Sequence, residues 1–237
     1  MPVDLVAPAK LTLSLRVTGV RDDGLHLIDA EMVSVDLHDR LELDEAGSEV
    51  VVVRYGRTQP APADGLVRRA LALAGRTAGV RLHKHVPAGA GLGGGSSDAA
   101  AVLRWSGERD PMRAVLLGAD VAFCLRGGRA RVTGIGEQLE PLPFEQRTLT
   151  LFTPPLHCST PVVYREWDRL GGPSGTHGND LEPAALSAYP ELVAHRDRFA
   201  DSTGMRPRLA GSGSTWFVEG DVPGPGHVVV RTVPAVR

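Results

Sequence analysis

The sequence has few cysteines, few aromatic residues and no long apolar run. Only Cys124 and Cys158 stand among 237 residues, and their spacing fits neither a metal motif nor a disulfide framework. We therefore expect both to be small buried hydrophobic residues. No apolar run reaches the roughly 18 residues needed to span a bilayer. The first ten residues also lack the basic-then-apolar pattern of a signal peptide, so we expect a cytoplasmic protein.

The chain has no strong excess of either charge. It carries 26 Lys and Arg against 28 Asp and Glu, which gives a formal charge of −2. Partners such as nucleic acid or an anionic membrane favour a basic excess, so neither is expected. The apolar fraction of 42% and the charged fraction of 23% are typical of a soluble globular protein of one or two domains. Nothing in the sequence indicates the oligomeric state.

Lysine is nearly absent, because Arg is used almost everywhere except at Lys10 and Lys84. Lys is a compact ammonium whose pKa can be tuned, whereas Arg is forked and always charged. A Lys retained in such a chain favours a chemical role, although chance retention is the alternative. His83 and His85 flank Lys84 on one strand face, where a metal pair is conceivable but a solvated face is more common.

Hydrophobic periodicity predicts a mixture of strands and helices in the first part of the chain. Alternating Leu and polar residues over 11–17 are typical of a strand. Further strands are expected at residues 25–37, 41–43, 50–54, 80–86, 121–125 and 130–133. Helices are expected at residues 65–78, 96–105 and 110–117. Asp64 is expected to cap the first of these helices, and Ser96 or Ser97 the second.

The second part of the chain, after a predicted joint at 141–146, indicates a smaller α+β unit. Its strands are expected at residues 149–153, 206–210, 215–219 and 227–231. Its helices are expected at residues 160–170, 181–186 and 190–200. The chain is thus predicted to form two domains, residues 1–147 and residues 148–237.

A glycine-rich loop between a predicted strand and a predicted helix is the strongest motif. Five of the seven residues from Gly89 to Gly95 are glycine, so the backbone can wrap closely around a ligand. Its N–H groups and the following helix N-terminus favour an anion. We therefore predict that this loop binds the phosphates of ATP. The loop residues are Pro87, Ala88, Gly89, Ala90, Gly91, Leu92, Gly93, Gly94, Gly95, Ser96 and Ser97.

Three other interpretations of this loop are weaker. Gly89, Gly91 and Gly94 match a dinucleotide fingerprint, but the preceding strand is polar on one face, unlike a Rossmann first strand. A Walker A loop ends in Gly-Lys-Ser/Thr, whereas Ser-Ser-Asp stands here. A flexible linker would not lie between a strand and a strongly apolar helix.

The loop sequence resembles the phosphate loop of the GHMP kinases. Six further segments resemble motifs of that superfamily in the expected order, so the resemblance spans nearly the whole chain. They are residues 7–11, 21–26, 117–123, 134–137, 179–182 and 211–214. Within the superfamily, the chain is most similar to members that phosphorylate the 2-hydroxyl of a cytidine-diphosphate-linked methylerythritol in non-mevalonate isoprenoid synthesis.

The resemblance implies a two-domain α/β (α+β) kinase that uses ATP and Mg²⁺, with its active site between the domains. The N-terminal domain would be ribosomal-protein-S5-like and bind the nucleotide, and the C-terminal domain would be ferredoxin-like. Phosphoryl transfer needs an in-line hydroxyl, an acceptor for its proton and positive charge near the γ-phosphate. The sequence shows no clear carboxylate for the metal and offers only Ser97 as a possible ligand.

The resemblance also assigns candidate roles in the active site. Asp120 would be the catalytic base and Lys10 its partner, although a turn aspartate is the alternative for Asp120. His26 would contact the cytosine of the substrate, unless it is only an exposed turn histidine. Further residues implied to bind substrate are Thr12, Gly211, Ser212 and Gly213.

Three positions differ from the family pattern. Thr12 stands where the family usually has Asn, Leu25 where it has Tyr, and Gly65 where it has Asn. The phosphate loop and catalytic pair are intact, whereas these positions concern substrate and base recognition. Another small alcohol as acceptor, or a weakly active nucleotide-binding paralogue, therefore stays open alongside the cytidylyl substrate.

Overall fold

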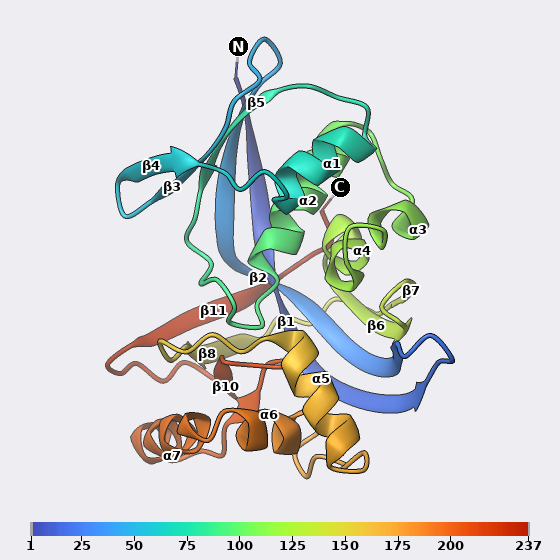
Figure 1. The fold of residues 1–237 in the computed structure, drawn as a ribbon. Coiled ribbons are helices and arrows are strands. Elements are labelled where there is room, and N and C mark those ends of the chain that lie inside the picture. Colours follow the sequence, from blue (N-terminus) through green and yellow to red (C-terminus); the bar gives the residue numbers. More distant parts are fainter. Residues whose placement is uncertain (1, 237) are drawn as a thin grey trace.

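Two long antiparallel strands run through the whole molecule (Figure 1). In the computed structural model, which describes residues 2–236, β1 (Val3–Val20) pairs with β2 (His26–Asp44) from Val3↔Leu43 to Val20↔His26. The strands expected at 25–37 and 41–43 are parts of this single β2. The register shifts after Pro8, which cannot donate to a ladder. The expected strands were therefore present but longer than the sequence pattern indicated.

Eleven strands form one connected sheet. β11 pairs antiparallel with both β2 and β8, and so connects strands from the two parts of the chain. The order along the main path is β4-β3-β5-β2-β11-β8-β10-β9, while β1 and β6 also pair with β2, and β7 pairs with β6. The remaining strands are β3 (Val50–Arg54), β4 (Arg57–Pro60), β5 (Gly79–His83), β6 (Arg129–Gly134), β7 (Gln138–Pro141), β8 (Thr148–Phe152), β9 (Arg208–Leu209), β10 (Trp216–Glu219) and β11 (His227–Val233).

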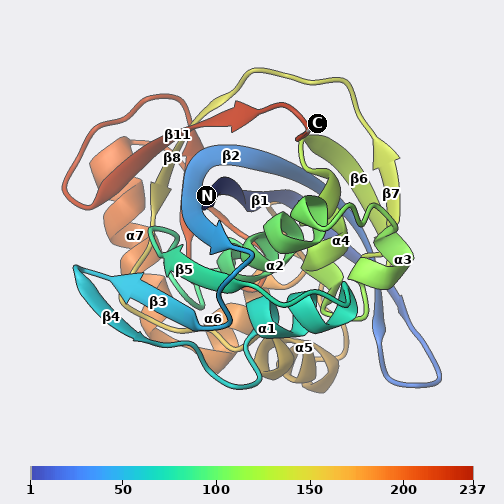
Figure 2. The ribbon, with the colours of Figure 1, turned by 90° about the horizontal axis from the view of Figure 1, so that it is seen from above.

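The helices form two groups, which Figures 1 and 2 show on separate parts of the sheet. The first group is α1 (Leu66–Leu73), α2 (Gly94–Trp105), α3 (Pro111–Ala114) and α4 (Ala119–Arg126). The second group is α5 (Thr160–Arg169), α6 (Glu182–Ala188) and α7 (Glu191–Thr203). The expected mixed α/β fold class is confirmed. The domain boundary at 147/148 stays a prediction.

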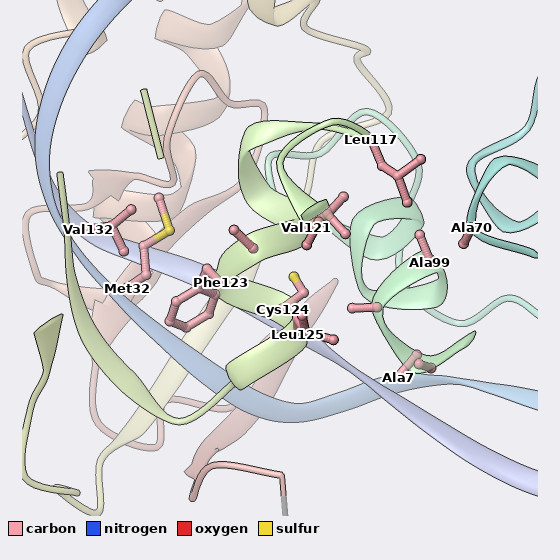
Figure 3. Packing of buried hydrophobic residues seen from close by; sticks show 14 of the residues in the cluster. Ala7, Met32, Ala70, Ala99, Leu117, Val121, Phe123, Cys124, Leu125 and Val132 are labelled. Atoms are coloured by element: carbon pink, nitrogen blue, oxygen red, sulfur yellow. The ribbon is translucent and has the colours of Figure 1, made fainter. Parts of the chain in front are cut away.

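The main core lies between the first helix group and the β1–β2 pair. In α2 every residue from Ser97 to Leu103 is buried, and its run of alanines allows the helix to pack closely on β1. Figure 3 shows Phe123 of α4 beside Met32 and Val132, which project from β2 and β6. These contacts fix α2 and α4, the two helices whose N-termini lead into the active site described below.

One expected element was wrong in type. Residues 121–125 were expected to be extended, but they lie within α4 and all five are buried. A short, continuously apolar run looks the same in a buried strand and a buried helix, so periodicity alone does not separate the two. Gly118 precedes α4 and Gly127 follows it, which gives the helix its bounds.

The expected helix caps were also wrong. α1 begins after Gly65, without a side-chain cap from Asp64, and it ends at Leu73 because Gly75 adopts a φ of +62°. The N-cap of α2 is Gly93, and neither Ser96 nor Ser97 caps the helix. Both serines instead lie inside its first turns, which moves the start of α2 into the glycine-rich loop.

The two cysteines behave as expected. Cys124 and Cys158 are both free and buried. Burial raises the pKa of the Cys124 thiol to about 12, so it stays protonated. Among residues 2–236, none of the helices is both long enough and apolar enough to cross a membrane.

Candidate active site

The glycine-rich loop is held between β1 and the second part of the chain. The backbone N–H of Lys10 donates to the carbonyl of Leu92 at 3.0 Å, and that of Thr215 donates to the carbonyl of Ala90 at 3.2 Å. These two loop carbonyls therefore face neighbouring backbone and point away from the ligand side of the loop. This arrangement leaves the N–H groups at the end of the loop for a ligand.

Two glycines of the loop are required by close neighbours as well as by their backbone angles. Gly91 and Gly93 have φ values of +77° and +65°. A Cβ on Gly91 would lie 2.4 Å from the carbonyl oxygen of Ala210, and one on Gly93 would lie 2.7 Å from Cγ of Lys10. Side chains at these positions would displace the protein itself, in addition to any bound phosphate.

The first turn of α2 forms an anion site at the end of the loop. The ladder of α2 starts with the N–H of Ser97, which donates to the carbonyl of Gly93 at 2.8 Å. The N–H groups of Gly94, Gly95 and Ser96 precede this bond and lack intrahelical acceptors. Together with the partial positive charge of a 12-residue helix, they favour phosphate oxygens.

A cavity of about 560 Å³ lies over the loop and fits a nucleotide. Its walls are the loop, the start of α1 and the β3–β4 hairpin. Apolar side chains line one side, and Arg54, Gln59 and Lys84 add polar groups. Gly65 lines this cavity, as expected for the position near the adenine.

A second cavity, of about 350 Å³, lies on the other side of the loop. It extends from Lys10 and Asp120 to Leu25 and His26 at the beginning of β2. The two cavities have four lining residues in common, and these mark where they meet. They are Gly91, Ser96, Asp120 and Thr160.

Lys10 and Asp120 come together at this junction although they are far apart in sequence. Lys10 Nζ lies 3.2 Å from Asp120 Oδ2 and donates to Thr12 Oγ1 at 3.1 Å. Lys10 is 5% exposed, whereas the Asp120 side chain is 36% exposed. Asp120 also lies in the first turn of α4, where the helix dipole favours a carboxylate. An accessible carboxyl group therefore faces both cavities beside a buried lysine.

His26 is not an exposed turn residue. Its side chain is 10% exposed, and Nε2 lies 2.8 Å from Asp168 Oδ1. Its ring lies 4.5 Å from that of Tyr164 and 5.6 Å from that of Trp167, centroid to centroid. Burial, with a smaller effect from the Asp120 charge, raises the pKa of Tyr164, which keeps its phenol neutral. This end of the cavity is thus lined by aromatic rings.

Of the other residues expected to bind substrate, three line the second cavity and one does not. Thr12, Gly211 and Ser212 line the second cavity. Asn179, the only asparagine in the chain, holds this segment by donating to the carbonyl of Gly211 at 2.7 Å. Gly213 lies behind the loop, where a Cβ would meet apolar neighbours, and it does not line either cavity. Direct substrate contact by these residues stays a prediction.

Sequence reasoning missed the contribution of α5. Thr160 lines both cavities, Tyr164 lines the second, and Asp168 contacts His26. The sequence of α5 resembles that of an ordinary amphipathic helix, and no local motif marks these residues. Only the placement of α5 against the beginning of β2 brings them into the site.

The described residues contain no group of three or more His, Cys, Asp or Glu side chains that could hold a metal ion. His83 Nε2 lies 3.1 Å from Glu42 Oε1 on the neighbouring strand β2. Mg²⁺ in kinases is held largely by substrate phosphates and water, with one or two carboxylates.

Comparison with known proteins first defines the class. Residues 64–109, which contain the loop and α2, match the family model of the GHMP kinases N terminal domain. The fold is shared with a solved mevalonate kinase, with a TM-score of 0.56, 12% identity, and coverage of 98% of this chain and 99% of that one. Fold and loop together are those of a GHMP kinase.

Relatives over the whole chain define the family more closely. A 4-diphosphocytidyl-2-C-methyl-D-erythritol kinase of Cereibacter sphaeroides is 37% identical over 89% of this chain and 87% of its own length. One of Dinoroseobacter shibae is 36% identical over 98% of this chain and 90% of its own length. A solved structure of such a kinase has a TM-score of 0.74 and 31% identity, and the match covers 97% of this chain and 99% of that one. This chain belongs to the 4-diphosphocytidyl-2-C-methyl-D-erythritol kinase family.

Proposed function

We propose that the protein transfers the γ-phosphate of ATP to the 2-hydroxyl of 4-diphosphocytidyl-2-C-methyl-D-erythritol, a step of non-mevalonate isoprenoid synthesis. The observation that carries this proposal is the meeting of two cavities at Lys10 and Asp120. The cavity over the glycine-rich loop takes the nucleotide, and the cavity that ends at His26 takes the alcohol. The names of the relatives supply the identity of the alcohol.

The chemistry follows from this arrangement. The acceptor hydroxyl lies beside Asp120, which takes its proton as the oxygen attacks the γ-phosphorus and the bond to the β-phosphate oxygen breaks. Lys10 orients Asp120, and its charge offsets charge on the transferred group. The N–H groups at the start of α2 hold phosphate oxygens. Bound Mg²⁺ would neutralise part of the triphosphate charge.

The far end of the second cavity suits a nucleobase. His26 presents a hydrogen-bonding ring, and Tyr164 adds a neutral aromatic surface beside it. Bases stack on aromatic side chains and hydrogen-bond along their edges. These residues lie in the same cavity as Asp120, so one elongated substrate can reach both ends.

The direct test is release of ADP with a panel of alcohols. The cytidylyl substrate is expected to support turnover far better than 2-C-methylerythritol 4-phosphate, which lacks the base. Turnover of base-free alcohols without any turnover of the cytidylyl substrate would contradict the proposed acceptor. It would leave a GHMP kinase for another small alcohol. No turnover with any alcohol would favour a weakly active paralogue.

Restoring an aromatic residue at position 25 is expected to strengthen substrate binding. Leu25 is 46% exposed and lines the second cavity beside His26. A ring there adds stacking, which is worth about 1–3 kcal/mol per base in nucleic-acid complexes. Leu25→Tyr is expected to lower KM for the cytidylyl substrate about tenfold, equal to about 1.4 kcal/mol, with kcat nearly unchanged. Steady-state kinetics at saturating ATP measure this, and an unchanged KM would remove position 25 from base recognition.

Replacing the buried ammonium by a guanidinium is expected to impair turnover. Lys10 Nζ lies close to Thr12, and a Cβ at Gly211 would be only 3.7 Å from it. The forked Arg side chain has no room to make the same point contact with Asp120. Lys10→Arg is expected to lower kcat about tenfold or more, with a normal circular dichroism spectrum. Wild-type kcat in this variant would show that only charge is needed at position 10.

A further inference from the structure

Three charged side chains are buried together beneath the glycine-rich loop. Asp39 is 0% exposed, Asp98 is 2% exposed, and the Lys84 side chain is 9% exposed. Lys84 Nζ donates to Asp39 Oδ2, and to Asp98 Oδ2 at 2.6 Å. Asp39 lies in β2, Lys84 directly follows β5, and Asp98 lies in α2. One ammonium thus bridges two carboxylates in the interior.

The positions of these residues relate them to the loop. Lys84 precedes the loop and Asp98 follows it, so their ion pair joins its two ends. Asp39 also accepts the backbone N–H groups of His85 at 2.5 Å and Val86 at 2.8 Å, which fixes the chain as it enters the loop. These bonds tie both ends of the loop to β2.

The start of α2 packs on the same group. A Cβ added to Gly94 would lie 3.3 Å from Asp39 Oδ2 and 3.0 Å from Val86. A shift of Asp39 would therefore be transmitted to Gly94, whose N–H is one of the free donors of the anion site. Asp39 lines neither cavity and so acts on the nucleotide only through its neighbours, whereas Lys84 and Asp98 also line the cavity over the loop.

Stability does not account for this cluster. Burial of two carboxylates with one ammonium leaves net negative charge in the interior, and the desolvation of such groups often exceeds their attraction. Asp98 Oδ1 has no hydrogen-bond partner among the described residues, which adds to the cost. Burial raises the pKa of Asp98 to about 7, although the nearby Lys84 charge lowers it.

We propose that Asp39, Lys84 and Asp98 form a clamp that fixes the distance between the two ends of the phosphate loop, and so sets its affinity for ATP. The three act as positioning residues and do not take part in phosphoryl transfer. The clamp rests on the proposed function, because it assumes that the nucleotide lies over this loop.

The experiment compares Asp39→Asn and Asp98→Asn with Glu182→Gln. Glu182 on α6 is a matched control, because it is also buried, has an oxygen without a partner and has a pKa raised by burial. For each protein, the melting temperature, the ATP affinity by calorimetry, KM for ATP and kcat are measured. Both aspartate variants are expected to raise Kd and KM for ATP about tenfold, with kcat within about threefold of the parent. The control is expected to keep parental values.

The outcomes separate the clamp from a merely structural role. A structural role lowers the folded fraction and with it the apparent kcat, but leaves KM for ATP unchanged. A folded Asp98→Asn protein with parental KM would therefore overturn the proposal, and this variant decides if Asp39→Asn does not fold. The parent protein could also show no turnover while Asp98→Asn still weakens its ATP binding. That result would contradict the proposed function but support the clamp.

The pH dependence supplies a second readout. Asn resembles protonated Asp98, and the charged groups that perturb Asp98 among the described residues are Lys84 and Asp39, while the neighbouring Cys124 thiol stays protonated. As pH falls from 8 to 6, Asp98 takes up a proton in the parent. The ratio of KM for ATP between Asp98→Asn and the parent is therefore expected to be largest at pH 8 and to approach one at pH 6. A ratio that stays constant over this range would contradict the proposal. Protonation of ATP itself affects both proteins equally and therefore does not change the ratio.

Discussion

Asp120→Asn is expected to lower kcat by roughly 10²-fold or more, while ATP affinity stays within a few-fold of the parental value. The amide has nearly the same shape as the carboxylate but does not accept the proton of the acceptor hydroxyl. Asp120 lies at the junction of the two cavities, 3.2 Å from Lys10. Its loss therefore affects the chemical step more than the binding of either substrate.

The matched control for this variant is Glu191→Gln. Glu191 is likewise an acidic residue in the first turn of a helix, α7, and it lines neither cavity, so the change removes the same helix-dipole interaction outside the site. Steady-state kinetics and a calorimetric ATP titration are run on both proteins. Turnover of Asp120→Asn within a few-fold of the control would remove Asp120 from the mechanism.

Gly93→Val is expected to weaken ATP binding by an order of magnitude or more and also to lower kcat. Its φ of +65° strains any residue with a Cβ. That Cβ would lie 2.7 Å from Cγ of Lys10, so the lysine has to move. Displacement of a catalytic group by about 1 Å costs on the order of 10²-fold in rate. One substitution thus disturbs both the phosphate loop and the catalytic pair.

Gly107→Val separates this effect from backbone strain alone. Gly107 has a φ of +87°, but a Cβ there would meet nothing within 4 Å. It is expected to lower the melting temperature and leave ATP affinity unchanged. If Gly93→Val has a normal circular dichroism spectrum and binds ATP as the parent does, the assignment of the loop is wrong.

The parts of the site that were predictable from sequence share one property. The phosphate loop is contiguous, so its composition alone indicates close backbone approach to a ligand. The resemblance placed Lys10 and Asp120 together, and the structure brings them within 3.2 Å. The sequence predicted only part of the reason why the loop contains glycine. We expected the glycines to make room for phosphate, whereas Gly91 and Gly93 also make room for Ala210 and Lys10.

The parts that were not predictable depend on tertiary packing. The apolar run 121–125 lies in a helix that packs against α2, α3 and β1, and no local pattern contains these contacts. Tyr164 and Asp168 lie in α5, far from His26 in the sequence, yet both contact it in the fold. Asp39 lies between the strands that were expected at 25–37 and 41–43, and its contact with Lys84 is visible only after β2 and β5 pair.

The double pairing of β11 has a consequence for the order of events during synthesis. Its Arg231 N–H donates to Asp36, a residue 195 positions earlier, and neighbouring residues pair with Ser34 and Val35. At about 5–20 residues per second, a ribosome needs roughly 10–40 s to make the chain between them. Until β11 emerges, β2 and β8 lack the strand that joins them, and this edge of the nascent sheet is open to wrong partners. Chaperone demand is therefore expected to concentrate in that interval.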